Sequence, residues 1–81
     1  MKVHDIVKLN PEIFPENKRF NPTFQAGALN YPAKMLMYEF RVVSEIKDEY
    51  HGEMLYVTMY DTENVERGNF YLRKQDCIPK E

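Results

Sequence analysis

From residue 35 onward the sequence alternates with a period of two, and this alternation constrains the fold more than any other feature. Residues 53–60 repeat the pattern, and the polar segment 48–52, which ends in a glycine, separates the two stretches. A period of two is typical of a half-buried strand, and a short polar segment ending in Gly is typical of a hairpin loop. The pattern therefore predicts two antiparallel strands joined by a hairpin. One face of the first strand holds Leu36, Tyr38, Phe40, Val42, Ser44 and Ile46, and one face of the second holds Leu55, Val57 and Met59.

Three shorter segments also read as strands. Residues 3–9 are rich in β-branched side chains and end at an Asn-Pro pair, which is a turn signal. Residues 69–73 alternate again, residues 74–76 read as a tight turn, and residues 77–78 form a last strand stopped by Pro79. Because open sheet edges invite unwanted pairing, five short antiparallel strands favour a closed arrangement. The sequence thus predicts an all-β fold, a small five-stranded antiparallel barrel formed by one domain over residues 1–81.

Residues 10–34 interrupt this pattern. The segment contains four of the five prolines, and proline is poorly tolerated in strand and helix interiors. We therefore expect a long loop with at most one helical turn after Asn10 and another over residues 21–26, the second ended by Gly27. A loop of this length in a compact domain is usually functional or disordered, and the aromatic residues of this one indicate that it packs on the domain.

The order of elements resembles the SH3-like barrel superfamily, including its KOW-type members. Residues 4–9, His-Asp-Ile-Val-Lys-Leu, are similar to the usual Gly-Asp-x-Val-x-Leu opening of such barrels. Residues 40–46 match a central strand, and residues 70–78 match the closing strand, 3₁₀ turn and final strand. The resemblance implies an SH3-like barrel with a long insertion after the first strand. It also implies a binding module, although a fold alone does not identify the partner.

Charge, cysteine content and hydropathy limit the function classes. The formal charge of −2, from 11 Lys and Arg against 13 Asp and Glu, disfavours nonspecific binding to nucleic acid. A single cysteine, Cys77, cannot form an internal disulfide, which fits a reducing cytoplasm. The first residues lack the apolar stretch of a secretory signal, and no apolar run reaches the roughly 18 residues of a membrane span. We therefore expect a cytoplasmic protein without a membrane partner.

The residue types that carry chemistry are sparse, so we expect neither an enzyme nor a cofactor or metal site. His4 and His51 lack a metal-ligand spacing, and Cys77 reads as a small buried hydrophobe. The three glycines form no phosphate-binding loop. The acidic segment 61–66 offers oxygen ligands but lacks the length and central glycine of an EF-hand, so we interpret it as a solvated turn.

Tyrosines on the outer face of the predicted barrel are the best candidates for binding. If the odd-numbered residues 55–59 fill the interior, Tyr56, Tyr60 and Tyr71 lie outside. Tyrosine gives a large contact area at a low entropic cost and is frequent at interface hot spots. The sequence leaves two alternatives open: the 10–34 loop folds over these rings, or a second copy covers them in a homodimer.

The predicted function is noncatalytic binding of a protein or peptide by a small adaptor or inhibitor of bacterial or phage type. The contact surface consists of the tyrosines and the 10–34 loop, from which Phe20, Phe24, Lys18 and Arg19 are the candidates. The alternative is a nucleic-acid-associated KOW or SH3-like module of transcription or translation. Its basic residues would be Lys18, Arg19, Lys34 and Arg73.

Overall fold

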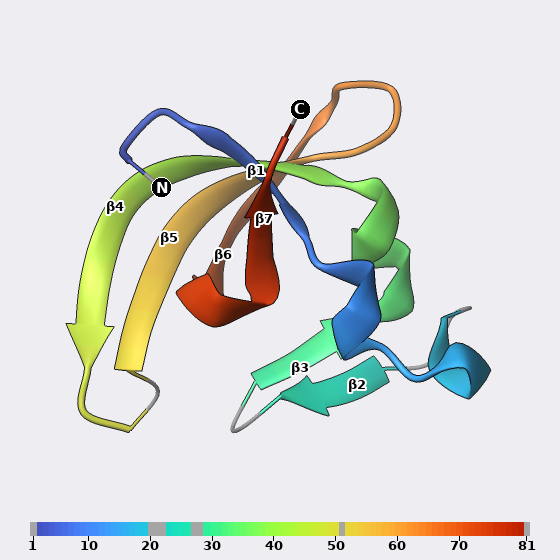
Figure 1. Ribbon diagram of the computed structural model, residues 1–81. Helices are drawn as coiled ribbons and strands as arrows, with labels where there is room; N and C mark the ends of the chain where they lie inside the picture. Colours follow the sequence, from blue (N-terminus) through green and yellow to red (C-terminus); the bar gives the residue numbers. More distant parts are fainter. Residues whose placement is uncertain (1, 20–22, 27–28, 51, 81) are drawn as a thin grey trace.

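The computed structural model describes residues 2–19, 23–26, 29–50 and 52–80 (Figure 1). All of its longer elements are strands, and the remaining regular elements are short 3₁₀ turns, so the all-β prediction is confirmed. The strands are β1 (Ile6–Leu9), β2 (Thr23–Ala26), β3 (Leu29–Pro32), β4 (Glu39–Asp48), β5 (Gly52–Tyr60), β6 (Glu66–Arg73) and β7 (Cys77–Pro79). The 3₁₀ turns are η1 (Pro11–Ile13), η2 (Glu16–Lys18), η3 (Ala33–Met37) and η4 (Lys74–Asp76).

The main sheet has five antiparallel strands in the order β6-β5-β4-β1-β7, and β2 and β3 form a separate hairpin. The sheet curls strongly but does not close, because β6 and β7 remain its two edges (Figure 1). The prediction of a closed barrel is therefore wrong. The end of β6 shows the physical reason, since the Arg73 N–H donates to the Tyr31 hydroxyl at 2.9 Å and the Arg73 carbonyl accepts from Cys77 Sγ at 3.4 Å. Side chains thus occupy the backbone groups with which a closing pairing between β6 and β7 would begin.

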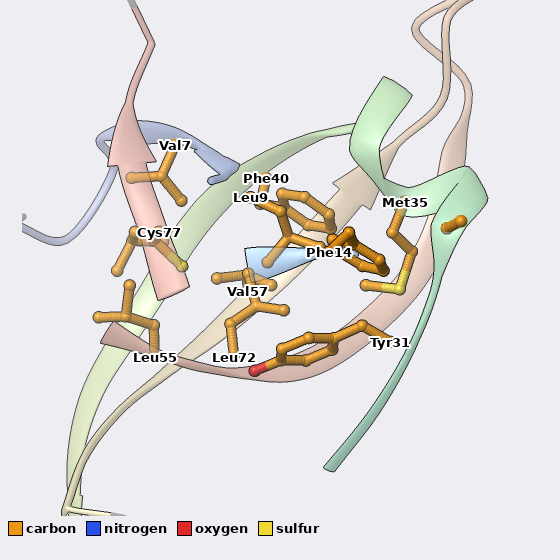
Figure 2. Packing of buried hydrophobic residues seen from close by; sticks show 12 residues of the cluster. Val7, Leu9, Phe14, Tyr31, Met35, Phe40, Leu55, Val57, Leu72 and Cys77 are labelled. Atoms are coloured by element: carbon orange, nitrogen blue, oxygen red, sulfur yellow. The ribbon is translucent and has the colours of Figure 1, made fainter. Parts of the chain in front are cut away.

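The hydrophobic core lies between the concave face of the sheet and the segment that joins β1 to β4. Val7, Phe40, Val42, Leu55, Val57 and Leu72 are fully buried strand residues of this core. From the other side, Phe14, Tyr31 and Met35 cover it, and each is at most 2% exposed (Figure 2). The insertion, with its two-stranded sheet β2–β3, thus completes the core of a small domain.

The structure corrects the sequence reading of residues 10–34, which are not one long loop but hold the hairpin β2–β3 and the 3₁₀ turns η1 and η2. The first helical turn is confirmed as η1, where Asn10 Oδ1 accepts from the Glu12 N–H at 3.0 Å. The second is wrong over its described part, since Thr23–Ala26 is strand β2, paired with β3. The hairpin partner gives this segment backbone hydrogen bonds that a single helical turn could not offer. Asn21, Pro22 and Gly27, which belonged to the same prediction, lie outside the described residues.

The long alternating segment also differs from the prediction at both ends. Residues 33–37 form η3, and β4 begins only at Glu39, because a run of helix-compatible apolar residues follows Pro32 and fits either period. Further along, the register shifts between Val42 and Ser44, where Val43 is a bulge residue. Beyond a bulge, every side chain changes face. Ser44 and Ile46 therefore lie on the outer face, opposite Tyr56 and Met54, and not on the core face as predicted.

Candidate interaction surface

The convex face of the sheet carries the predicted tyrosines, and we call it the outer face, defined by Arg41, Ser44, Met54, Tyr56, Thr58, Tyr60, Asn69 and Tyr71. Alternation along β5 directs Leu55 and Val57 into the core and Tyr56 and Tyr60 away from it. The register of β5 and β6 pairs Tyr56 directly with Tyr71. Their ring centroids are 4.8 Å apart with an interplanar angle of 46°, a tilted aromatic pair. The Tyr71 ring remains accessible, since this residue is 49% exposed.

Tyr60 lies toward the other end of β5 and has a different neighbour. The guanidinium carbon of Arg41 is 5.9 Å from the centre of its ring, which is within the range of a cation–π contact. Arg41 reaches this position from the neighbouring strand, where it pairs with Thr58. The outer face therefore holds one aromatic pair and one aromatic–cation pair along the same strand.

Between these two contacts, the outer face is packed against itself. Met54 and Thr58 point outward with the tyrosines, yet each is only 5% exposed. The Thr58 hydroxyl donates to Asn69 Oδ1 across the β5–β6 pair at 3.0 Å. Such cross-strand contacts hold side chains in defined positions. The tyrosine rings thus stand on an ordered platform.

The aromatic residues of the 10–34 segment that the structure describes do not lie over these rings. Phe14 is buried in the core, and its ring centroid is 5.5 Å from that of Phe24, which is half-buried beside the same core. Phe24 and the three tyrosines are therefore on opposite sides of the sheet. Arg19 is exposed at the end of η2. Phe20 and the side chain of Lys18 lie outside the described part of the structure.

A buried polar cluster fixes the β2–β3 hairpin to the end of the sheet. The Tyr31 hydroxyl donates to Asp76 Oδ2 at 3.1 Å, and Arg73 forms a two-pronged pair with the same carboxylate through Nε at 2.7 Å and Nη2 at 3.0 Å. Burial, with the Asp76 charge as a smaller cause, raises the pKa of Tyr31 far above its usual range, and the hydrogen bond to Asp76 raises that of Arg73. The Tyr31 hydroxyl and both carboxylate oxygens of Asp76 have partners, so the cluster is an anchor. It also neutralises Arg73, one of the four basic residues of the nucleic-acid alternative.

The remaining chemical candidates are held in structural roles. Burial, reinforced by the charge of Asp76, raises the pKa of the Cys77 thiol to about 12, so the reactive thiolate is scarce at neutral pH. Asp61 Oδ1 accepts the N–H groups of Glu63 and Val65 at 2.9 and 3.0 Å, and the hydrogen bond from Val65 is the main cause of its lowered pKa. The acidic segment is therefore a loop closed by its own first carboxylate. Within the described residues, no three metal-ligating side chains gather, and no helix has the length and apolar character needed to cross a bilayer.

Three features of the structure could not be predicted from the sequence: the Arg41–Tyr60 contact and the Thr58–Asn69 hydrogen bond on the outer face, and the buried Tyr31–Asp76–Arg73 anchor. The first two depend on which residues face each other across strands, and the third joins residues more than forty positions apart in the chain. No local pattern specifies either arrangement. Comparison of the chain with protein-family models, curated proteins and solved structures gives no match.

Proposed function

We propose that this chain is a noncatalytic interaction module that binds a protein or peptide through its outer face. One observation carries the proposal: Tyr56, Tyr60 and Tyr71 share a face that the placed aromatic residues of the insertion leave uncovered, and half of Tyr71 is exposed. Cross-strand contacts already order the rings, so binding would cost little further side-chain entropy. Aromatic anchors of this kind carry a large share of the energy at protein interfaces.

We also propose that the fold is SH3-like, although the sheet is open. Its support is the order β6-β5-β4-β1-β7, the long insertion after β1, and the 3₁₀ turn η4 between the last two strands. It also includes a role as an adaptor or inhibitor in a bacterial or phage-infected cytoplasm. The buried, unpaired Cys77 is compatible with such a reducing compartment.

The test is to immobilise the chain, recover bound proteins from the native host, and compare variants of equal chemical change. Tyr60→Ala and Tyr71→Ala should each weaken capture of the specific partner at least tenfold, as expected for aromatic hot spots. Tyr50→Ala is the matched control, since Tyr50 is 91% exposed in the β4–β5 turn and away from the outer face. Equal loss with all three variants would contradict the proposal.

Salt concentration separates the proposal from nucleic-acid binding. Contacts to phosphates weaken steeply between low and moderate salt, whereas a tyrosine-centred contact changes little. Loss of binding with Arg19→Ala, but not with Tyr60→Ala, would favour the nucleic-acid alternative. Sedimentation at increasing protein concentration addresses the third possibility, because a homodimer through the outer face would bring the tyrosines of two copies together.

A further inference from the structure

The exposed edge of β6 has two different parts. At Arg73 the outward backbone N–H and C=O are occupied by Tyr31 and Cys77. The outward groups of alternate strand residues point the same way, so those of Asn69 and Tyr71 share this edge. No described residue forms a hydrogen bond with them. Two backbone donors and two backbone acceptors are therefore available on the β6 edge, next to Arg73, whose own outward groups are already occupied.

A groove of about 510 Å³ lies beside this open part of the edge. Its apolar wall includes Met35, Tyr38, Met59 and Phe70. Phe70 is the residue between Asn69 and Tyr71, and its side chain points to the core side of β6, opposite to theirs. A strand paired with this edge would therefore direct every second side chain into the groove.

The charges at the groove are both positive. Lys34 is exposed and makes no ion pair with any described residue. Arg67, whose side chain is 56% exposed, uses Nε for Asp61 at 2.8 Å, and its terminal nitrogens have no hydrogen bond within the described chain. Among the described residues, no carboxylate lines the groove. A ligand with an acidic side chain would therefore meet Lys34, together with the terminal nitrogens of Arg67, whose charge Asp61 already balances, beside an apolar wall.

A bulge shapes this site. Thr58 pairs with Asn69 and Tyr60 pairs with Glu66, so that Arg67 and Gly68 together face Met59. Gly68 has φ of 95°, a conformation that glycine adopts without strain. The extra residue brings Arg67 to the groove side of the strand, and the regular pairing resumes at Asn69.

We infer that the β6 edge from Arg67 to Tyr71, together with the groove beside Lys34, binds an extended segment of another protein as an added strand. The segment carries an apolar residue that packs on Phe70 and Met59, and an acidic residue two positions away that pairs with Lys34 and Arg67. Backbone hydrogen bonds to Asn69 and Tyr71 give affinity, and the groove selects the sequence. This site uses the backbone of Tyr71 and not its ring, so it does not depend on binding by the outer-face tyrosine side chains.

A phage-displayed library of random nonapeptides, selected on the immobilised chain, tests the inference. Enriched peptides should share Asp or Glu two positions from a Leu, Ile, Val or Phe. Lys34→Glu should weaken the best peptide about fivefold or more, while Lys47→Glu, the same change on the far end of β4, should stay within about twofold. Failure to enrich this pattern, or an equal effect of the two variants, would overturn the inference.

Backbone pairing is tested separately with the enriched peptide. Methylation of its backbone nitrogens, one at a time, should abolish binding at alternate positions only, because only those nitrogens face β6. Amide exchange at Asn69 and Tyr71 should slow when the peptide is bound. Peptide-induced shifts confined to Tyr56 and Tyr60 would refute the edge site. So would slow exchange of the same two amides in concentrated protein without peptide, since a second copy would then occupy the edge.

Discussion

The two faces of the main sheet are built by the same strands, yet they end in different environments. On the concave face, Phe40, Leu55 and Leu72 have no exposed surface, because they pack in one cluster with insertion residues such as Phe14 and Tyr31 and with Cys77 of β7 (Figure 2). On the outer face, within the described part of the chain, the side chains pack against one another, and Tyr71 is 49% exposed. Alternation creates two faces, but the second layer decides which becomes core. Here that layer is the segment with most of the prolines, and its aromatic residues select the concave side.

The difference between the two faces should have its largest effect on stability at neighbouring residues of β5 that point to opposite faces. Leu55→Ala should lower the free energy of unfolding by about 2–5 kcal/mol, since it leaves a cavity in a fully packed core. Tyr56→Ala should cost about 1 kcal/mol, because its ring is only half-buried and its partner Tyr71 remains. Urea denaturation monitored by circular dichroism measures both values. Equal costs would mean that the two faces are energetically alike.

The next effect concerns the anchor that holds the second layer in place. Tyr31→Phe keeps the ring in the core but removes the hydroxyl that donates to Asp76 and accepts from the Arg73 N–H. Leaving these buried groups without that partner should cost about 1–3 kcal/mol. Urea denaturation measures the loss, and faster amide exchange at Arg73 should accompany it. The same change at the 91% exposed Tyr50 is the control and should have no measurable effect.

Unchanged stability in Tyr31→Phe would show that apolar packing alone fixes the insertion. The hydroxyl would then contribute nothing to stability. The absence of further strand pairing at the Arg73 end of the β6 edge would need another explanation. Asp76→Asn provides a second check, since it weakens the pair with Arg73 while it preserves the shape of the side chain.

The same comparison explains what the sequence can and cannot predict. Residues 53–60 alternate cleanly, and the placement of Leu55 and Val57 inside and of Tyr56 outside is confirmed. Residues 35–38 are apolar at every position, so their periodicity distinguishes no element, and they form η3 up to Met37. A bulge at Val43 then reverses the face of Ile46, and no single residue type marks such a bulge.

Long-range contacts were beyond any local reading of the sequence. The tight turn at residues 74–76 is confirmed as η4, but its Asp76 reads as a turn residue and proves to be the buried partner of Tyr31 and Arg73. Those contacts also oppose closure of the barrel, because they occupy the end of β6. The predicted binding residues lie on two different faces for a similar reason. Phe24 is not beside the tyrosines but packs with Phe14 on the core side, a position set by the hairpin β2–β3.

A smaller, pH-dependent effect is expected from Cys77 on the core side. Its folded-state pKa of about 12 lies above the value near 8.5 of an unfolded chain, so the unfolded state releases its proton first as the pH rises. The stabilisation is complete below about pH 8.5 and is lost toward pH 12, at a rate of at most roughly 1.4 kcal/mol per pH unit. Between pH 9 and 10, the chain should thus lose about 1 kcal/mol more than Cys77→Ala does. Urea denaturation of both proteins at the two pH values measures the difference, and parallel losses would contradict burial of the thiol.

The smallest effect lies on the outer face, in the contact between Tyr56 and Tyr71. A double-mutant cycle with alanine at both positions should give a coupling of about 0.5–1 kcal/mol, the range of a tilted aromatic pair at a partly exposed site. Arg41→Ala, combined with Tyr71→Ala, is the control, because Arg41 contacts Tyr60 instead and the two changes should add. Coupling near zero would mean that Tyr71 is positioned by its strand alone, and that the platform is less ordered than its geometry indicates. Coupling well above 2 kcal/mol would mean that the pair belongs to the stabilising core. An intermediate value is what a surface kept for binding should show, since its rings are ordered while their removal leaves the fold intact.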